Sequence, residues 1–259
     1  VEVVAAPDLL SLLNHFKGTA ALSPPQPGAV EAPVRSADLK QVKGQEVAKR
    51  ALEIAAAGGH NLLMNGPPGA GKSMLAARLP SILPPLDPRE LLEVSMIHSV
   101  AGAIAGGALT DRRPFRSPHH SASMAALVGG GVHAKPGEIS LAHNGVLFLD
   151  EFAEINSSAL EALRTPLEDG VIRLARREGV ASYPCRFQLV LAANLCPCAP
   201  PDPRDCVCAS VDRRRYRSRL SGPLLDRVDL RVEMHASRAG TFADDAGEST
   251  AAVRERVWA

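Results

Sequence analysis

Residues 66–73 read Gly-Pro-Pro-Gly-Ala-Gly-Lys-Ser (GPPGAGKS), and this stretch decides the fold. It follows the short apolar run HNLLMN (60–65) and leads into SMLAARLPSIL (73–83), which reads as a helix. A strand, a glycine-rich turn and a helix in this order form a phosphate-binding loop, in which backbone N–H groups point at phosphate oxygens. The sequence therefore predicts an α/β domain with a nucleotide site at this turn.

The loop supplies three kinds of group to a bound nucleotide. Its glycines let the backbone approach the phosphates, Lys72 brings positive charge to the β and γ phosphates, and Ser73 can ligate Mg²⁺. A chance match in a glycine-rich turn is the alternative, and the flanking strand and helix argue against it. We expect ATP and Mg²⁺ as cofactors, with the nucleotide held by Gly66, Pro67, Pro68, Gly69, Ala70, Gly71, Lys72, Ser73 and Met74.

Two acids follow a second apolar run, VLFLDE (146–151). An apolar run that ends in acids is typical of a buried parallel strand with the acids at its carboxyl end. Asp150 would hold the metal through water, and Glu151 would orient or deprotonate the attacking water. The alternative is that two acids merely end a buried strand.

Two further polar residues are candidates for the same site. Asn194 ends the apolar run RFQLVLAAN (186–194), where parallel sheets place ligand-contacting groups, although an asparagine that starts a turn is the alternative. Arg227 lies in SGPLLDRVDL (221–230), and it would stabilise transition-state charge at the nucleotide of a neighbouring subunit. A local ion pair with Asp226 or Asp229 is the competing interpretation.

The bulk composition excludes some classes of protein. The 259 residues are 46% hydrophobic and carry a net charge of +1, which gives no global preference for nucleic acid. No apolar run reaches the roughly 18 residues of a membrane span, and the first residues lack the zones of a signal peptide, so we expect a cytoplasmic protein without a membrane partner. Positive charge is concentrated in DRRPFR (111–116), RLARR (173–177) and RRRYRSR (213–219). For each cluster, an ordinary solvated surface is the alternative to a binding role.

Other segments have simple local patterns. We expect helices over 7–18, 45–59 and 157–170, with Gly58 and Gly59 ending the second of them. Residues 84–139 are rich in Gly, Pro, His and Arg, and they are interpreted as inserted loops and short helices. The stretch VIRLARREGVASY (171–183) alternates about a charged centre, which predicts a β-hairpin.

Four cysteines form the pattern C-P-C-x7-C-V-C. Four thiolates this close in sequence could bind a structural Zn²⁺, but the usual spacing is C-x2-C, and the spacing alone favours free thiols with zinc as the alternative. His119 and His120 have no third partner at a metal-binding spacing, so we interpret them as insert-loop residues. The zinc candidates are Cys196, Cys198, Cys206 and Cys208.

Taken together, five stretches resemble the magnesium-chelatase-like AAA+ family, and within it the ComM/YifB-type bacterial proteins. The resemblance runs from about Asp38 to Val232. It implies an α/β P-loop NTPase with a five-stranded, mostly parallel sheet, helices on both faces, an insert in helix 2 and a β-hairpin before sensor 1. The stretches are GQEVAKRALEIAAAGGHNLLMNGPPGAGKS (44–73), RPFRSPHH (113–120), PGEISLAHNGVLFLDE (136–151), LEALRTPLEDG (160–170) and YRSRLSGPLLDRVDL (216–230).

The resemblance also assigns residues to roles. Lys72 and Ser73 match Walker A, Asp150 and Glu151 match Walker B, Asn194 matches sensor 1 and Arg227 matches the arginine finger. The adenine would lie near Gly44 and Gln45. The hairpin arginines Arg173, Arg176 and Arg177 would contact a DNA backbone inside a ring.

The family implies a hexameric ring ATPase that acts on single-stranded or branched DNA, as a helicase or branch-migration factor in natural transformation. A chelatase motor subunit and a nucleotide-dependent remodelling protein remain alternatives. We expect residues 1–35 to be the exit segment of a Lon-like domain, 36–235 to be the ATPase core, and 236–259 to be a linker and the start of a helical lid. With most of the lid and its sensor 2 arginine missing, slow hydrolysis is expected of this chain.

Overall fold

The fold centres on a five-stranded sheet in which every pair of neighbours is parallel. The computed structural model describes residues 4–24, 38–104, 109–131, 134–176, 179–219, 224–236 and 247–259. The strands lie in the order β2-β5-β8-β1-β9, so the strand that enters the glycine loop lies inside the sheet. Their bounds are β1 Leu62–Asn65, β2 Phe115–Arg116, β5 Val146–Leu149, β8 Gln188–Ala193 and β9 Leu230–Glu233.

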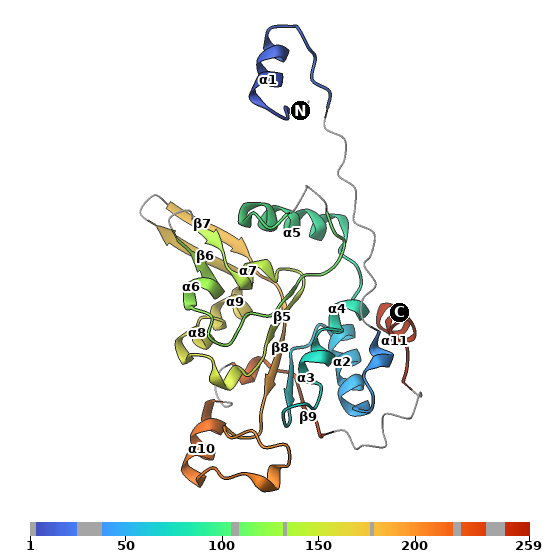
Figure 1. The fold of residues 1–259 in the computed structure, drawn as a ribbon, viewed down its shortest axis with the longest axis vertical. Coiled ribbons are helices and arrows are strands. Elements are labelled where there is room, and N and C mark those ends of the chain that lie inside the picture. Colours follow the sequence, from blue (N-terminus) through green and yellow to red (C-terminus); the bar gives the residue numbers. More distant parts are fainter. Residues whose placement is uncertain are drawn as a thin grey trace.

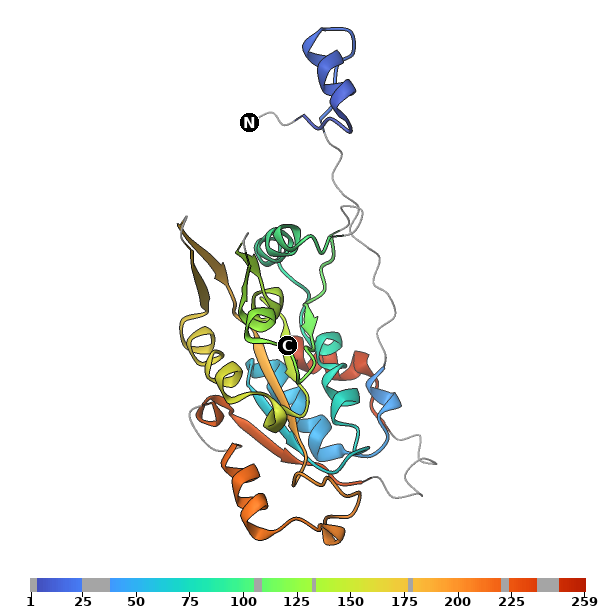
Figure 2. The ribbon, with the colours of Figure 1, turned by 60° about the vertical axis from the view of Figure 1, so that its left-hand side comes forward.

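Successive residues of the central strands face two separate cores. Leu62 and Met64 pack into one, while Leu63 packs into the other, because side chains alternate across a sheet. Figures 1 and 2 show helices on both sides of the sheet, which confirms the predicted layering. One face carries α2 (Glu46–Gly58), α3 (Lys72–Ala76), α4 (Leu79–Ile82) and α11 (Thr250–Trp258), and the other carries α6 (Met124–Val128), α7 (Glu138–Leu141) and α8 (Ser157–Glu161).

Prolines divide two helices that the sequence predicts as continuous. The expected helix over 73–83 is two pieces, α3 and α4, because Pro80 lacks an N–H and crowds the preceding turn. The expected helix over 157–170 is likewise divided into α8 and α9 (Arg164–Asp169), and Pro166 lies in the first turn of α9. The helix expected over 45–59 is α2, and Gly59 ends it with a positive φ of 65°.

Residues 84–139 contain one long helix, α5 (Pro88–Ala101), where the sequence analysis predicted only inserted loops and short helices. Its start has a complete capping box: the Asp87 carboxylate accepts from the Glu90 N–H, and the Glu90 carboxylate accepts from the Asp87 N–H. Gly102 ends it in the left-handed region. The rest of this segment includes α6 and a short antiparallel pair, β3 (Gly129–Gly130) and β4 (Lys135–Pro136).

The predicted hairpin is present as β6 (Val171–Arg176) and β7 (Gly179–Pro184), paired antiparallel. Ile172 and Leu174 are buried while Arg173 between them is exposed, so only one face of β6 packs against the core. The remaining elements are α1 (Leu9–Phe16), η1 (Leu39–Gln41), η2 (Phe152–Glu154), η3 (Pro203–Asp205), α10 (Ser210–Arg219) and η4 (Leu225–Arg227). Among the described residues, no helix has the length and apolar character needed to cross a bilayer.

Two arginines of the first basic cluster have structural roles. Arg113 forms a bidentate pair with Glu90 at 3.0 and 3.1 Å, which ties α5 to the segment before β2. Arg116 pairs with Glu138 of α7 at 2.6 and 2.7 Å. Neither arginine is therefore part of the solvated surface that the sequence analysis gave as the alternative, because both guanidinium groups are held in ion pairs within the domain.

A buried histidine joins α5 to the turn before β5. The Arg186 N–H donates to His143 Nδ1 at 3.1 Å, so the other ring nitrogen, Nε2, carries the proton and donates to Glu93 at 3.1 Å. Burial lowers the pKa of His143, although the charge of Glu93 opposes that shift. The hydrogen bond from His143 in turn holds the pKa of Glu93 below its ordinary value.

Both shifts make the fold less stable in acid. Below the ordinary histidine pKa of about 6.5, the unfolded chain takes up a proton at position 143 that the folded chain resists. The free energy of unfolding should therefore fall as the pH is lowered from about 7.5 to about 5.5. In urea unfolding experiments we expect His143→Gln to flatten this dependence, while the exposed control His119→Gln keeps it. Equal slopes for both variants would contradict the assignment to His143.

Candidate functional site

The phosphate-binding loop lies where β1 ends, beside the ends of β5 and β8. Gly69 and Gly71 adopt positive φ values of 75° and 89°, which L side chains rarely take. A Cβ added at Gly69 would meet no atom within 4 Å, so the loop faces open space. At Gly66, by contrast, a Cβ would lie 2.5 Å from the Met234 carbonyl oxygen, and only glycine lets the loop start so close to the end of β9.

Lys72 points back into its own loop. Its Nζ donates to the carbonyl oxygens of Gly66 at 2.7 Å and Pro67 at 3.0 Å, and to Asn194 Oδ1 at 3.1 Å. Burial lowers the pKa of Lys72, and the negative charges of Asp150 and Glu151 oppose that shift. The structure thus brings together the predicted Walker A lysine and the predicted sensor 1 asparagine.

The two candidate metal ligands are in direct contact. Ser73 Oγ donates to Asp150 Oδ2 at 2.5 Å, and the other carboxylate oxygen of Asp150 accepts from the Glu151 N–H at 2.9 Å. A hydroxyl and a carboxylate are the oxygen ligands that Mg²⁺ prefers. Together with the open loop and the nearby ammonium of Lys72, this donor set fits a nucleotide with magnesium.

Glu151 has a partner that the sequence analysis missed. His120, which follows β2 by four residues, has Nδ1 3.1 Å from Glu151 Oε2. Both side chains are partly exposed, at 39% and 48%. The interpretation of His120 as a loop residue therefore omits a direct contact with the candidate base. Because nothing in the local spacing links SPHH to VLFLDE, only the three-dimensional structure shows this pair.

The segment expected near the adenine lies against the loop. Gly44 and Gln45 both have positive φ, 66° and 59°, so the chain turns sharply before α2. The Gln45 amide Nε2 donates to the carbonyl oxygens of Ala70 at 3.2 Å and His235 at 2.5 Å. These bonds fix the segment between the loop and the residues that follow β9.

Arg227 lies away from the loop of its own chain. Its carbonyl oxygen accepts from Asn61 Nδ2 at 2.7 Å, immediately before β1, whereas the loop follows β1. The four-residue strand between them spans about 13 Å. The guanidinium pairs with Glu168 of α9 at 2.5 Å and not with Asp226 or Asp229, so a different ion pair takes the place of the local one expected from the sequence.

Of the candidate DNA-contacting arginines, one has a described side chain. Arg173 is exposed on β6, and its Nη1 lies 3.4 Å from Asp169 Oδ2. Arg176 ends the strand, but its side chain lies outside the described part of the chain, and so does all of Arg177. The structure therefore places the hairpin but not the contacts of these two arginines.

Comparison with known proteins gives close relatives. A protein of Mycobacterium tuberculosis, called uncharacterized protein Rv2897c, is 60% identical over 99% of this chain and 52% of its own length. Uncharacterized protein YifB of Escherichia coli is 47% identical over 98% of this chain and 51% of its own length. Competence protein ComM of Haemophilus influenzae is 49% identical over 85% of this chain and 44% of its own length. The chain thus spans about half the length of the curated relatives it matches.

Solved structures give a weaker likeness. NtrX from Brucella abortus in complex with ATP matches 87% of this chain and 42% of its own, at 16% identity and a TM-score of 0.47. The family described as "Magnesium chelatase, subunit ChlI" matches residues 38–242, in agreement with the motifs and the sheet order described above. The chain therefore belongs to this magnesium-chelatase-like AAA+ family.

Proposed function

We propose that this chain binds ATP with Mg²⁺ and hydrolyses it. The observation that carries the proposal is the convergence of Lys72, the Ser73–Asp150 pair and Asn194 at the adjacent carboxyl ends of three parallel strands. Open α/β sheets bind ligands at these ends. The ATPase core proposed here covers residues 36–235.

The residues divide the work of phosphoryl transfer. Lys72 would exchange its bonds to the loop carbonyls for bonds to phosphate oxygens, and Ser73 and Asp150 would hold the metal. When bound, the magnesium ion would neutralise part of the negative charge of the phosphate groups. Glu151 accepts the proton of the attacking water, for which it must turn from His120, and Asn194 positions the water or the γ phosphate. Gly44 and Gln45 contact the adenine.

The site proposed here is shared between subunits of a hexameric ring. Arg227 lies at the opposite end of β1 from the loop, so it is too far away to serve the nucleotide of its own chain. An exposed arginine in this position suits the nucleotide of a neighbour, where it stabilises transition-state charge.

We propose DNA, single-stranded or branched, as the substrate of the ring, which would act as a helicase or branch-migration motor in the cytoplasm. A relative at 49% identity is named a competence protein, which supports a role in natural transformation. The hairpin β6–β7 projects beyond the sheet in Figure 1, and Arg173 is exposed on it. Contacts between arginine and phosphate are independent of base sequence and sensitive to salt.

Charge reversal on the hairpin tests the DNA proposal. We expect the triple variant Arg173→Glu, Arg176→Glu, Arg177→Glu to lose stimulation of ATP hydrolysis by single-stranded DNA and to retain nucleotide binding. In the unaltered protein, the stimulation should fall steeply with salt, because each phosphate contact releases counterions. Hydrolysis would be followed by phosphate release, with and without DNA, over a series of salt concentrations.

The matched control is Arg50→Glu, because Arg50 is an exposed arginine of α2 that, like Arg173, pairs with an acid close by in the sequence. It should leave DNA stimulation intact. Equal loss of stimulation and nucleotide binding in the hairpin variant would count against the proposal. If the unaltered protein showed no DNA binding at low salt, the motor interpretation would be abandoned.

The family description favours a second candidate, the motor subunit of a metal-inserting chelatase. Its ATPase core would use the same residues, but its hydrolysis would respond to a partner protein and not to DNA. A nucleotide-dependent remodelling protein would respond to unfolded polypeptide instead. The DNA-stimulation experiment therefore separates the first proposal from both alternatives.

A further inference from the structure

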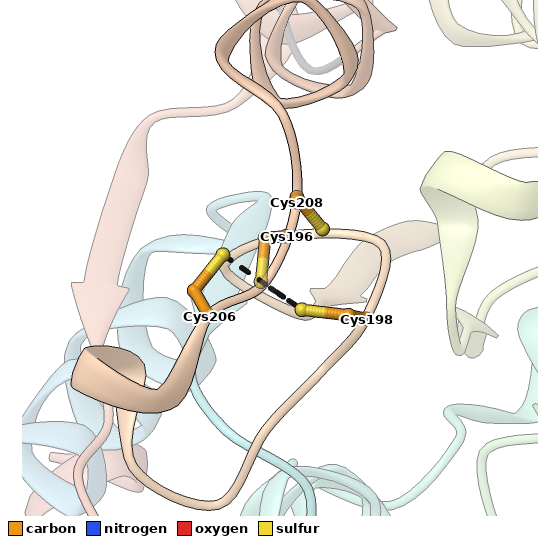
Figure 3. Close-up of side chains that lie close together, drawn as sticks. All are labelled: Cys196, Cys198, Cys206 and Cys208. Atoms are coloured by element: carbon orange, nitrogen blue, oxygen red, sulfur yellow. Dashed lines mark hydrogen bonds between the residues drawn. The ribbon is translucent and has the colours of Figure 1, made fainter.

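Four cysteines converge in the segment that joins β8 to α10. Figure 3 shows the side chains of Cys196, Cys198, Cys206 and Cys208 turned toward one another. Their four sulfur atoms all lie within 4.8 Å of each other. The sulfurs of Cys196 and Cys198 are 3.5 Å apart, and those of Cys198 and Cys206 are 3.7 Å apart.

These separations match a metal centre better than they match disulfides. Four thiolates about 2.3 Å from a zinc ion, at tetrahedral angles, lie about 3.8 Å from one another. A disulfide requires a sulfur separation of about 2.05 Å and joins sulfurs in pairs. The separations of 3.5 and 3.7 Å are close to the tetrahedral value, and all four sulfurs lie within 4.8 Å of one another, as expected where four cysteines surround one structural zinc ion.

The backbone explains how the unusual spacing can serve one metal. In an extended strand, the two cysteines of C-P-C would be about 6.6 Å apart along the chain. Here they lie in a turn, in which the Ala199 N–H donates to the Cys196 carbonyl oxygen at 3.2 Å and Ala199 has a φ of 45°. The turn shortens the distance and lets both sulfurs face the second pair.

The second pair is positioned by the elements around it. The Asp202 side chain caps η3 by accepting from the Arg204 N–H at 2.9 Å, and Cys206 follows directly. Cys208 lies two residues before α10, whose amino end carries positive potential. Arg215 lines the same groove as Cys198 and Cys208, so a further positive charge lies near the thiolates.

We propose that Cys196, Cys198, Cys206 and Cys208 bind one structural Zn²⁺. The ion would join the exit of β8, which carries Asn194 two residues before Cys196, to the start of α10. That helix exposes Arg213, Arg214, Arg215 and Arg217 and buries Tyr216. The metal thus fixes a basic helix relative to the strand that reaches the nucleotide site, and it does so whether or not the chain hydrolyses ATP.

Metal content tests the proposal directly. The protein is prepared with zinc in the growth medium and purified with reductant and without chelator, and its metals are measured by mass spectrometry. We expect about one zinc per chain. The variant Cys198→Ser, Cys208→Ser should lose at least about tenfold in zinc affinity, measured by competition with a chromogenic chelator.

Two controls separate metal binding from folding. Cys185→Ala removes a buried cysteine outside the cluster and should keep the full zinc content. Circular dichroism shows whether the double variant folds. If it does not fold, cobalt substitution of the unaltered protein decides instead, since four thiolates around cobalt give a characteristic visible absorption that a site without thiolates lacks.

Several results would overturn the proposal. One is the absence of zinc from protein equilibrated with excess zinc under reducing conditions. Another is unchanged reactivity of the cluster thiols toward an alkylating reagent when zinc is added. Iron bound in place of zinc would overturn the choice of metal, because the same tetrahedral sulfur site also suits iron.

Discussion

The Glu151→Gln variant is expected to bind ATP as the unaltered protein does and to hydrolyse it about 10²- to 10⁴-fold more slowly, the usual contribution of a general base. Glutamine keeps the shape of the side chain but cannot accept the proton of the attacking water. Ser73, Asp150 and Lys72 stay in place, so the nucleotide and its metal should still bind. Phosphate release at high enzyme concentration measures the rate, and a fluorescent ATP analogue measures the affinity.

Glu154→Gln is the matched control, because Glu154 is exposed in η2 three residues further on and has no role in the proposed mechanism. It should hydrolyse ATP at the unaltered rate. If Glu151→Gln reduced the binding of ATP as strongly as its turnover, Glu151 would be a binding residue and not the base. An unchanged rate in this variant would remove Glu151 from the mechanism.

Arg227→Ala is expected to lower hydrolysis about 10³-fold or more, as the loss of an arginine finger does. Because the proposed arginine acts on a neighbour, mixing two inactive variants should restore activity. In a 1:1 mixture with Glu151→Gln, half of the sites retain Glu151, and half of those face a neighbour that retains Arg227. The mixture should therefore recover about a quarter of the unaltered rate when subunits exchange freely across a head-to-tail ring.

The mixing experiment distinguishes the two places where Arg227 could act. If the arginine served its own chain, every site in the mixture would lack one group, and no activity would return. Glu168→Gln controls for the ion pair of Arg227, because it removes the partner and keeps the arginine. A loss in Glu168→Gln as large as in Arg227→Ala would assign Arg227 a structural role. Light scattering would establish that the mixed sample is assembled.

The parts of the site that are adjacent to strands could be predicted from the sequence. Strand, glycine loop and helix are contiguous in the chain, so the position of Lys72 follows from local rules. Asp150 and Asn194 end apolar runs, and the parallel-sheet rule brings such ends together. The meeting of Lys72 with Asn194 therefore agrees with the expectation from the sequence, and the roles of these residues stay predictions.

Contacts made by inserted segments could not be predicted in this way. His120 contacts Glu151 from a loop whose path depends on α5, α6 and the Arg116–Glu138 pair. No periodic pattern in the sequence predicts the path of that loop. The helix α5 itself was detectable, because Asp87, Pro88 and Glu90 form a helix-start signal that the composition of the segment obscured. The convergence of the cysteines depends on a turn at Ala199, a residue with no intrinsic preference for positive φ.

Successive side chains of the central strands pack into two different cores, and this arrangement limits how the sequence can change in length. In β8, Leu189 and Leu191 belong to one core, and Val190 and Ala192 belong to the other. Deleting one residue from β8 would turn every later side chain to the opposite layer and shift Asn194 away from Lys72. Each core can accept apolar substitutions of similar volume, but the lengths of these strands are fixed. Homologous chains should therefore differ in length in the loops and hairpins and not in β1, β5 or β8.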